Sequence, residues 1–459
     1  MSYDDTIAAI ATSSKNGSIS VIRVSGTNSL ILVSKIFYNR KRKRIDLSEC
    51  DTHTIQYGFI CDGEKKCLDE VLVLIMKAPR SYTTEDVVEI HCHGGHFICQ
   101  EILKLLIKSG VRIAEPGEFT KRAFLNGRLD MSQAESVMDI IQSKSKIALE
   151  NSFNHLRGKV RDKITYLREI ILEDVAYLEA ALDDPEHISL DDFSANIEEH
   201  VNDLLKEIVH LIENSENGRL IREGIYTVIV GKPNVGKSSL LNCMLRENRA
   251  IVTDIPGTTR DTLEEDLLIG DTLLHLIDTA GIHETNNEVE NIGIEKAKES
   301  IEKADFVICV LGQNEMITEE DKKVLSLIED KEGVILLNKN DLSAAFGKDE
   351  IEKYSKKKII SFSATQGEGL DELEAYINQL FLKVDFNDDI YITNMRQRQA
   401  LLDARDSLMK VKESIELGIP EDMYAIDLTD AYRSLGSILG ETVEEDIIDK
   451  IFKDFCMGK

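Results

Sequence analysis

A glycine-rich loop near the middle of the chain constrains the fold more than any other feature. It spans residues 231–238 (GKPNVGKS), follows the apolar run 226–230 and precedes a run with helical character at 239–245. This order of strand, loop and helix is the P-loop arrangement, in which backbone N–H groups turn toward phosphates at a helix N-terminus. Lys237 is suited to reach the β- and γ-phosphates, and the Ser238 hydroxyl is a ligand for Mg²⁺. The loop therefore predicts an α/β domain that binds a nucleoside triphosphate.

A second motif identifies the base. The run 338–341 (NKND) follows the apolar run 334–337, so it lies at the carboxyl end of a predicted strand, where open α/β sheets bind ligands. A carboxylate at Asp341 can accept hydrogen bonds from the N1–H and the 2-amino group of guanine. Adenine offers neither donor and would leave the charge unpaired. The sequence therefore predicts GTP and not ATP.

Two further motifs complete the pattern of a Ras-like G domain. The run 363–365 (SAT) follows a third apolar run, and its backbone is expected to cover the guanine carbonyl. The run 278–281 (DTAG) follows a fourth, which predicts Asp278 in the Mg²⁺ shell and the Gly281 N–H at the γ-phosphate. Because all four motifs occur in the expected order, they leave little room for an accidental match.

The composition bounds the setting of this domain. At 459 residues the chain is long enough for two to four domains. Its eight cysteines show no regular pairing, its first residues are acidic and no apolar run approaches the length of a membrane span, so we expect a cytoplasmic protein with no membrane association. The net charge, 55 − 83 = −28, argues against broad nucleic-acid binding. For the basic run 40–44 (RKRKR) we favour a solvated loop, with a local RNA contact as the alternative.

The texture of the sequence changes along the chain. Short β-rich runs come first. Apolar residues spaced by three and four between Ile164 and Leu178 then indicate helix. Around the four motifs, predicted strands alternate with predicted helices, and helical spacing returns near the end of the sequence. We predict an α+β domain at 1–118, a helical domain split into halves at 119–220 and 382–459, and an α/β G domain at 221–381 inserted between those halves.

The whole chain also resembles the MnmE (TrmE) family of tRNA modification GTPases. The runs that carry the resemblance are 21–26 (VIRVSG), 93–95 (HGG), 116–127 (PGEFTKRAFLNG), 257–261 (GTTRD) and 455–459 (FCMGK). Met457 stands where the family usually has isoleucine, which is a small apolar difference. The resemblance implies that the first domain binds folate and forms a dimer.

The resemblance also implies how GTP is hydrolysed. Ile282 occupies the position at which Ras-like GTPases carry a water-positioning glutamine, and an apolar side chain cannot orient water. Three glutamates follow, of which Glu290 matches the catalytic residue of the family. No arginine finger is evident in the sequence, and the resemblance implies that K⁺ takes its place. The expected K⁺ ligands are Asn234, Thr253, Ile255 and Thr258, and the expected Mg²⁺ ligands are Ser238 and Thr259.

The four motifs and the resemblance together define an expected nucleotide site. Its GTP-binding residues are Asn234, Val235, Gly236, Lys237, Ser238 and Ser239 in the P-loop, Thr253, Asp254, Ile255, Pro256, Gly257, Thr258 and Thr259 in the next loop, then Asp278, Thr279, Ala280, Gly281, Asn338, Lys339, Asp341, Ser363 and Ala364.

A tetrahydrofolate derivative, the 5,10-methylene or the 5-formyl form, is the second ligand that the resemblance implies. The matching positions are Arg23, Glu89, Arg128 and Lys459. A glutamate can accept from a pterin amide and amino group, and cations suit the folate carboxylates, although each of these residues is equally compatible with a surface ion pair. Cys456 matches a family cysteine beside this site, which implies a catalytic role in the modification chemistry.

The segment 91–99 (HCHGGHFIC) contains five potential metal ligands in nine residues. Two histidines alternate with a cysteine on a predicted strand, and no second Cys/His cluster follows at a usual distance for a zinc site. We therefore favour a Gly-Gly turn into a helix that lines the folate pocket, with a metallohydrolase as the alternative reading.

The favoured function is that of the resembled family. It is a GTPase that forms a homodimer and, with an FAD-bearing MnmG (GidA) flavoprotein in a heterotetramer, adds an aminomethyl or carboxymethylaminomethyl group to C5 of the wobble uridine of certain tRNAs. A ribosome-assembly GTPase resembling Era is an alternative of another class. That family appends a basic RNA-binding module, and only residues 40–44 resemble one here.

Overall fold

The computed structural model of the protein describes most of the chain. The described residues are 5–12, 17–62, 66–184, 187, 193–247, 265–277, 298–381, 390–441, 445–453, 455 and 458. The chain forms two compact units: Met1–Met138 with His155–Leu190 and Pro420–Lys459, and Asp139–Asn154 with Asp191–Ile419. The domain boundaries expected from the sequence remain a prediction.

A seven-stranded sheet organises the first unit. Its strand order is β3-β4-β5-β6-β2-β1-β7, and every neighbouring pair is antiparallel except β1 and β7. The strands are β1 (Ile7–Ile10), β2 (Ile19–Ser25), β3 (Phe37–Asn39), β4 (Thr54–Cys61), β5 (Cys67–Met76), β6 (Val87–His93) and β7 (Arg112–Ile113). Side chains alternate between the two faces, so one face can be apolar and the other can carry function.

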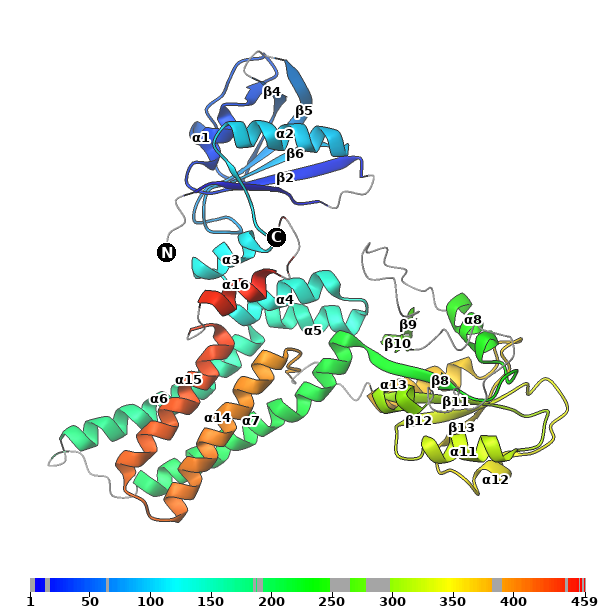
Figure 1. The fold of residues 1–459 in the computed structure, drawn as a ribbon. Coiled ribbons are helices and arrows are strands. Elements are labelled where there is room, and N and C mark those ends of the chain that lie inside the picture. The colour runs from blue at the N-terminus through cyan, green and yellow to red at the C-terminus, as the bar shows by residue number, and fades with distance from the viewer. Residues whose placement is uncertain are drawn as a thin grey trace. The chain divides into compact units, whose positions relative to one another are not determined.

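Two helices cover one face of this sheet, α1 (Ser29–Ser34) and α2 (His96–Lys108) (Figure 1). Ile22 and Ile90 on the strands pack into one buried cluster with Val33 of α1 and Ile102 of α2. Because Ile22 points into this core, its neighbour Arg23 points to the opposite face. Cys61 and Cys67 form a disulfide across the β4–β5 hairpin, a pairing that the cysteine spacing did not predict.

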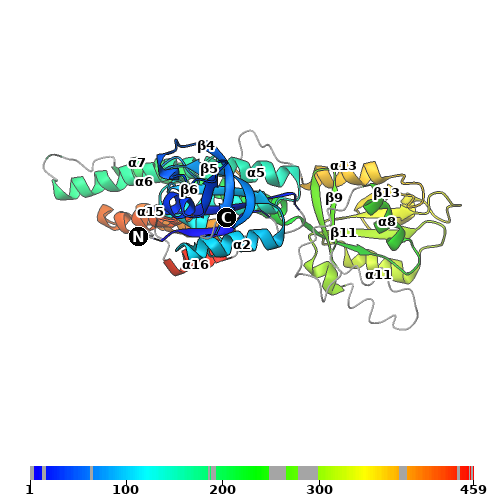
Figure 2. The ribbon, with the colours of Figure 1, turned by 90° about the horizontal axis from the view of Figure 1, so that it is seen from above.

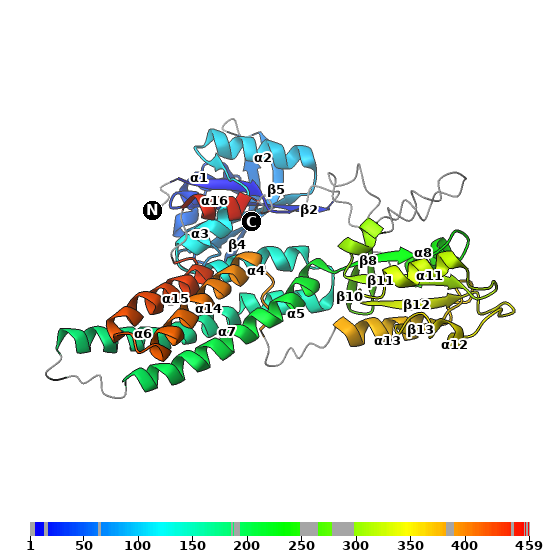
Figure 3. The same cartoon turned by 60° about the horizontal axis from the view of Figure 1, so that its bottom comes forward.

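Helices make up the rest of the first unit. They are α3 (Glu118–Leu125), α6 (Lys159–Asp183), the short 3-10 helix η2 (Glu421–Met423), α15 (Tyr424–Leu439) and α16 (Glu445–Lys453). Helices α6 and α15 lie alongside each other (Figure 3). In α6 the predicted stripe is largely buried, at Ile164, Leu167, Ile171 and Leu178, which is the pattern expected of a helix with one packed face.

A six-stranded sheet organises the second unit. Its order is β13-β12-β11-β8-β10-β9, with all pairs parallel except the antiparallel β9–β10 hairpin. The strands are β8 (Ile225–Val230), β9 (Glu265–Ile269), β10 (Thr272–Leu276), β11 (Phe306–Gly312), β12 (Gly333–Asn338) and β13 (Lys358–Ser361). The four apolar runs that precede the nucleotide motifs are therefore strands β8, β10, β12 and β13. The predicted runs 226–230 and 334–337 lie within one residue of the bounds of β8 and β12.

Helices cover both faces of this sheet. Residues of α8 (Lys237–Glu247) and α13 (Leu370–Phe381) belong to one buried cluster, and residues of α11 (Glu319–Leu327) and α12 (Lys348–Ile351) belong to another. Figure 2 shows α13 and α11 on opposite sides of the strands. This is the doubly wound arrangement of a P-loop domain, so the predicted fold class is confirmed.

Two long helices of the second unit, α7 (Phe193–Glu223) and α14 (Met395–Glu416), flank the sheet domain in sequence and pack along each other (Figure 3). A second short 3-10 helix, η1 (Leu47–Glu49), precedes β4. Helices α4 (Met131–Gln142) and α5 (Lys146–Leu156) each contribute residues to both units. The α/β segment is thus inserted into a helical segment along the chain, as the sequence predicted.

Candidate functional site

The P-loop joins β8 to α8 with three residues in left-handed backbone conformations. Gly231 has φ +147°, Asn234 has φ 64° and Gly236 has φ 102°. A Cβ atom on Gly231 would lie 2.3 Å from the carbonyl oxygen of Val310, and one on Gly236 would lie 2.1 Å from Asn338 Nδ2. Both glycines are therefore required by close packing as well as by conformation. Because α8 begins at Lys237, its N-terminus lies at the loop, an arrangement that favours binding of an anion.

Lys237 lies over this loop and contacts only neutral groups in it. Its Nζ donates to the carbonyl oxygens of Gly231 at 2.7 Å and Lys232 at 2.8 Å. Burial lowers the pKa of Lys237, since removal from water penalises the charged form. A phosphate in the loop would supply the negative charge that favours the ammonium form.

Asn338, at the end of β12, connects two loops that follow different strands. Its Nδ2 donates to the Val235 carbonyl in the P-loop at 2.8 Å, and its Oδ1 accepts from the Ala364 N–H at 3.1 Å. The side chain is buried, with 2% of its surface exposed, and both ends of its amide are satisfied. Asn338 was expected only as part of the nucleotide site, and its connecting role was not foreseen. It holds the phosphate loop and the loop after β13 at a fixed separation.

Asp341 and Ser363 meet at the same edge of the sheet. The Ser363 hydroxyl donates to Asp341 Oδ1 at 2.9 Å, and the Asn340 N–H donates to the Phe362 carbonyl at 3.2 Å. Ser363 is fully buried whereas Asp341 is exposed, so the buried hydroxyl orients a carboxylate that remains accessible. Each carboxylate oxygen accepts more than one hydrogen bond, so the contact with Ser363 leaves capacity for the two N–H groups of guanine.

Ser238 and Ser239 lie in the first turn of α8, and Lys339 directly follows β12. The remaining expected residues of the nucleotide site lie outside the described residues, and their roles remain predictions. They are Thr253, Asp254, Ile255, Pro256, Gly257, Thr258, Thr259, Asp278, Thr279, Ala280, Gly281 and the catalytic candidate Glu290. The β9–β10 hairpin links these two segments in sequence, since β9 begins at Glu265 and β10 ends at Leu276.

The β9–β10 hairpin carries a charged contact of its own. Asp266 on β9 accepts from His275 Nδ1 on β10 at 2.6 Å and forms an ion pair with Lys144, which lies between α4 and α5. The hydrogen bond from His275 outweighs burial and, with Lys144, lowers the pKa of Asp266 to about 2. This contact joins the hairpin to the α4–α5 connection.

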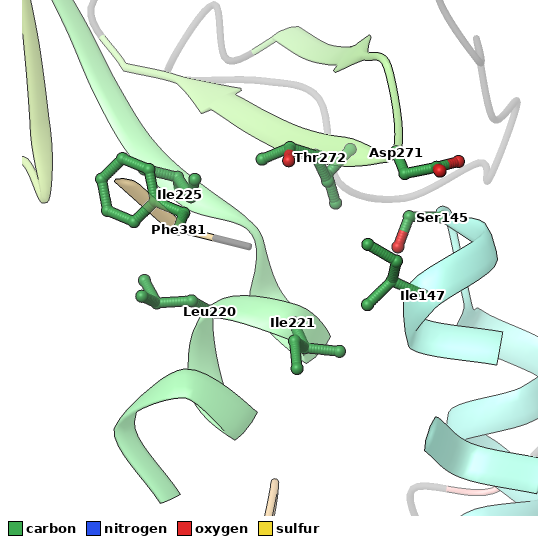
Figure 4. A pocket seen from close by; sticks show the side chains of 9 residues that line it. Ser145, Ile147, Leu220, Ile221, Ile225, Asp271, Thr272 and Phe381 are labelled. Atoms are coloured by element: carbon green, nitrogen blue, oxygen red, sulfur yellow. The ribbon is translucent and has the colours of Figure 1, made fainter. Parts of the chain in front are cut away.

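A small cavity lies beside this contact. It is lined mainly by apolar side chains, including Ile147, Leu220, Ile225 and Phe381, with Thr272 at its edge (Figure 4). None of the expected GTP- or folate-binding residues lines it. The cavity therefore does not belong to the nucleotide site.

A second cluster of expected site residues lies on the face of the first sheet that α1 and α2 leave uncovered. Arg23 on β2 pairs in register with Glu89 on β6, and Arg23 Nε lies 2.9 Å from Glu89 Oε1. Arg23 Nη1 also lies 3.5 Å from the carbonyl oxygen of Gly458. The expected residues Cys456 and Lys459 lie outside the described residues, and their roles remain predictions. The structure thus brings Arg23, Glu89 and Gly458 together.

Tyr82 connects Arg128 to this cluster. The guanidinium carbon of Arg23 lies 5.2 Å from the centroid of the Tyr82 ring, and that of Arg128 lies 4.8 Å from it. Arg128 Nη1 further donates to the Tyr82 carbonyl at 3.0 Å. Both distances fall within the range of cation–π contacts. No sequence motif distinguished Tyr82, which lies in the connection between β5 and β6.

The histidine and cysteine side chains of β6 are separated by the two faces of the sheet. Cys92 is buried with its Sγ 3.8 Å from that of Cys99, while His93 is exposed and its Nδ1 lies 2.6 Å from Asp69 Oδ1. Gly95 caps α2, so the predicted Gly-Gly turn into a helix is confirmed. His91 Nε2 is buried without a hydrogen-bond partner among the described residues, 3.6 Å from Glu89 Oε2. It is therefore available to a polar ligand bound at Glu89.

Sequence reasoning missed a buried ion-pair network next to this cluster. Arg122 on α3 is fully buried and contacts Asp5 Oδ1 at 2.6 Å, Glu85 Oε1 at 3.1 Å and Glu118 Oε1 at 3.0 Å. Burial alone would lower the pKa of Arg122, but the carboxylates of Glu85 and Glu118 raise it. Loss of one partner would leave a buried charge uncompensated, so the network fixes α3 against the loop that carries Tyr82.

Two family models match the chain. The model of the MnmE helical domain matches residues 131–456, and that of the GTP-binding protein TrmE N-terminus matches residues 6–128. Among the described residues, no helix is long and apolar enough to cross a membrane.

Relatives match over the full length. The tRNA modification GTPase MnmE of Lachnoclostridium phytofermentans is 51% identical over 458 residues, covering 99% of each chain, and that of Clostridioides difficile is 46% identical over 466 residues, covering 100% of each. Among solved structures, the G domain of the T. maritima FeoB iron transporter aligns with 35% of this chain and 99% of its own, at 23% identity and a TM-score of 0.27. Because relatives that align over their full length are 46% and 51% identical to it and two family models match, the chain belongs to the MnmE family of tRNA modification GTPases.

Proposed function

We propose that this GTP hydrolase of the MnmE family acts on tRNA with an MnmG-type flavoprotein that carries FAD. Together they add an aminomethyl or carboxymethylaminomethyl group to C5 of the uridine at wobble position 34, in the cytoplasm. A tetrahydrofolate derivative supplies the one-carbon unit, and GTP turnover drives domain rearrangement. The full-length similarity to proteins named tRNA modification GTPase MnmE supports this proposal.

The observation that carries the GTPase part is the Asn338 bridge between the phosphate loop and the loop after β13. It ties the phosphate site to the loop whose Ser363 orients Asp341 toward a base. The tight fit of Gly231 and Gly236 matches a loop in which backbone N–H groups hold phosphates.

Within this site each residue has a distinct task. Lys237 neutralises charge on the β- and γ-phosphates, and the N-terminus of α8 donates N–H groups to them. Asp341 selects guanine. Mg²⁺, when bound, neutralises phosphate charge, and Ser238 with Thr259 would hold it. Asp278 and Gly281 would complete the site around Mg²⁺ and the γ-phosphate.

Hydrolysis is expected to depend on K⁺ and on Glu290. Asn234, with its left-handed backbone at the turn of the P-loop, is available as a K⁺ ligand together with Thr253, Ile255 and Thr258. Glu290 would orient the attacking water, since Ile282 cannot. In Glu290→Ala we expect the rate of GTP hydrolysis to fall about a hundredfold while GTP binding is preserved. In the wild type we expect this rate to fall at least about tenfold when KCl is replaced by NaCl at equal ionic strength. Equal rates in the two salts would argue against a K⁺ site.

Folate binding is expected at the Arg23–Glu89 cluster. The fit rests on the unpartnered His91 Nε2 beside Glu89 and on two guanidinium groups stacked on Tyr82. The Arg23→Ala variant should bind 5-formyltetrahydrofolate about tenfold more weakly by calorimetry, because a charge-assisted contact is lost. Arg80→Ala is the matched control, since Arg80 is exposed two residues from Tyr82. If both variants bind 5-formyltetrahydrofolate with equal affinity, the folate site does not include Arg23.

The modification of tRNA is tested separately from the binding of GTP and of folate. Cells whose only copy carries Cys456→Ser should lack the modified wobble uridine while the purified variant hydrolyses GTP normally. Normal modification in that strain would remove Cys456 from the reaction.

A homodimer is supported by the open face of the first sheet. Large apolar side chains on β2, β4 and β5 are exposed there, namely Ile19 (65%), Ile55 (60%), Tyr57 (44%) and Leu72 (44%). Exposed apolar patches of this kind mark interaction surfaces. Contact with a second copy of the chain would remove these apolar side chains from water, on the same face as the Arg23–Glu89 cluster. Sedimentation of the purified chain as a monomer would count against a homodimer. The MnmG-type flavoprotein would join this dimer to form a heterotetramer.

A further inference from the structure

The basic run 40–44 forms an ordered hairpin between β3 and β4. The Asn39 N–H donates to the Lys43 carbonyl at 2.9 Å, and the Arg42 N–H donates to the Asn39 carbonyl at 2.7 Å. Asn39 Oδ1 accepts from the N–H groups of Lys41 at 2.9 Å and Lys43 at 3.0 Å. Arg42 adopts a left-handed conformation at φ 55° to close the turn. The backbone is therefore held by its own hydrogen bonds, and the cationic side chains are not needed to form it.

These cationic side chains are exposed to solvent and can bind an anion. All five residues are exposed, and none of them forms an ion pair with a described carboxylate. The acidic residue that follows most closely, Asp46, accepts from the Ser48 N–H at 2.9 Å and caps the next helical turn, and the hydrogen bonds from Ser48 lower its pKa. Elsewhere in the described chain, basic residues such as Arg112, Arg168 and Arg219 are paired with carboxylates.

One of the five side chains is fixed in place. Arg44 Nε donates to the Tyr38 hydroxyl at 2.9 Å, and its guanidinium carbon lies 5.5 Å from the centroid of the Tyr38 ring. Tyr38 itself is buried, with 5% of its surface exposed. A guanidinium that is already ordered loses less conformational entropy when it binds a phosphate.

The net charge of the chain decides what this hairpin can bind. At −28 the protein repels a phosphate backbone at long range, so contact with a polyanion requires a local excess of positive charge. Five consecutive cations without carboxylate partners among the described residues provide that excess. Guanidinium groups bind phosphate oxygens through paired N–H donors, and a run of cations matches the closely spaced charges of a nucleic-acid backbone.

We infer that the hairpin at residues 40–44 is a contact for the phosphate backbone of tRNA. This inference rests on the proposed function, because tRNA is the polyanion on which the protein is proposed to act. The contact fixes the orientation of the RNA and carries no sequence information. Specificity for particular tRNAs must then come from other contacts.

Charge neutralisation of the hairpin tests this inference. In the variant Arg40→Gln/Arg42→Gln/Lys43→Gln three cations are lost while the Arg44–Tyr38 contact stays. The matched control Lys348→Gln/Lys353→Gln/Lys356→Gln removes the same charge from exposed lysines in and next to α12. Binding of a fluorescent tRNA transcript is measured by anisotropy from about 50 to 200 mM KCl, with the chain alone and with its flavoprotein partner.

The hairpin variant should bind tRNA at least about tenfold more weakly at low salt. The slope of the logarithm of the binding constant against the logarithm of the salt concentration should decrease in magnitude by about 2 to 3, because each lost phosphate contact contributes about 0.7–0.9. The control should keep the affinity and slope of the wild type, and both variants should keep wild-type GTP hydrolysis.

Three results would overturn the inference. If the hairpin variant binds tRNA like the wild type, the hairpin is not the contact and the proposed function stands. If both variants weaken equally, net charge alone explains the loss. If, in a parallel assay with phosphatidylserine vesicles, the hairpin variant loses vesicle binding that the wild type shows and keeps its tRNA binding, the partner is a membrane. Absence of tRNA binding by the wild type, with and without the flavoprotein, would instead contradict the proposed function itself.

Discussion

Gly236→Ala is expected to weaken GTP binding about a thousandfold. The new methyl group would lie 2.1 Å from Asn338 Nδ2, and φ at this position is 102°, so the side chain and the backbone are both incompatible with alanine. Left-handed strain costs about 1–2 kcal/mol, and a buried Val235 carbonyl without its donor costs about 1–3 kcal/mol more. Together these terms reach about 4 kcal/mol, which corresponds to three orders of magnitude in affinity.

The measurement is titration with a fluorescent GTP analogue, with thermal unfolding recorded in parallel. Gly347→Ala is the matched control, because a Cβ atom there meets nothing within 4 Å and Gly347 has φ −106°. It should bind GTP normally. Wild-type affinity in Gly236→Ala would mean that the Asn338 bridge does not support the phosphate loop.

Asp341→Asn is expected to lower the affinity for GTP about a thousandfold while the affinity for xanthosine triphosphate rises. The amide can no longer accept from both N–H groups of guanine, and sites built around such hydrogen bonds discriminate strongly when a partner is lost. Xanthine carries a carbonyl in place of the 2-amino group, so the amide N–H can donate to it.

Competition binding with both nucleotides measures this exchange. The Ser363 hydroxyl, which donates to Asp341 in the wild type, can still donate to the carbonyl oxygen of the new amide, so the loop should keep its position. Loss of affinity for both nucleotides, with folate binding intact, would mean that Asp341 supports the loop and does not read the base.

The sequence predicted the parts of the fold that depend on local pattern. Strands β8, β10, β12 and β13 are short apolar runs that end at polar or glycine-rich motifs. Their positions could therefore be inferred, and so could the location of the four motifs at the carboxyl ends of the strands. The turn before α2 was predicted from its two glycines for the same reason.

Features that depend on contacts between distant segments could not be predicted. The amide of Asn338 reaches Val235, 103 residues earlier, and nothing in the sequence distinguishes such a residue from a ligand-binding asparagine. Arg122 and Glu118 have the spacing of an exposed helical ion pair, yet both are buried. Their other partners come from outside the helix, since Asp5 and Glu85 pair with Arg122 and Arg112 pairs with Glu118. Tyr82 belongs to no motif, and only the packing of Arg23 and Arg128 around its ring reveals its role.

The Asn338 bridge has a thermodynamic consequence for ligands smaller than GTP. Since the Asn338 carboxamide is hydrogen-bonded to both loops, pyrophosphate that stabilises the P-loop should also stabilise the loop after β13 in the conformation that binds guanosine. The two fragments should therefore bind cooperatively although they do not touch, and each should raise the affinity of the other by the same factor.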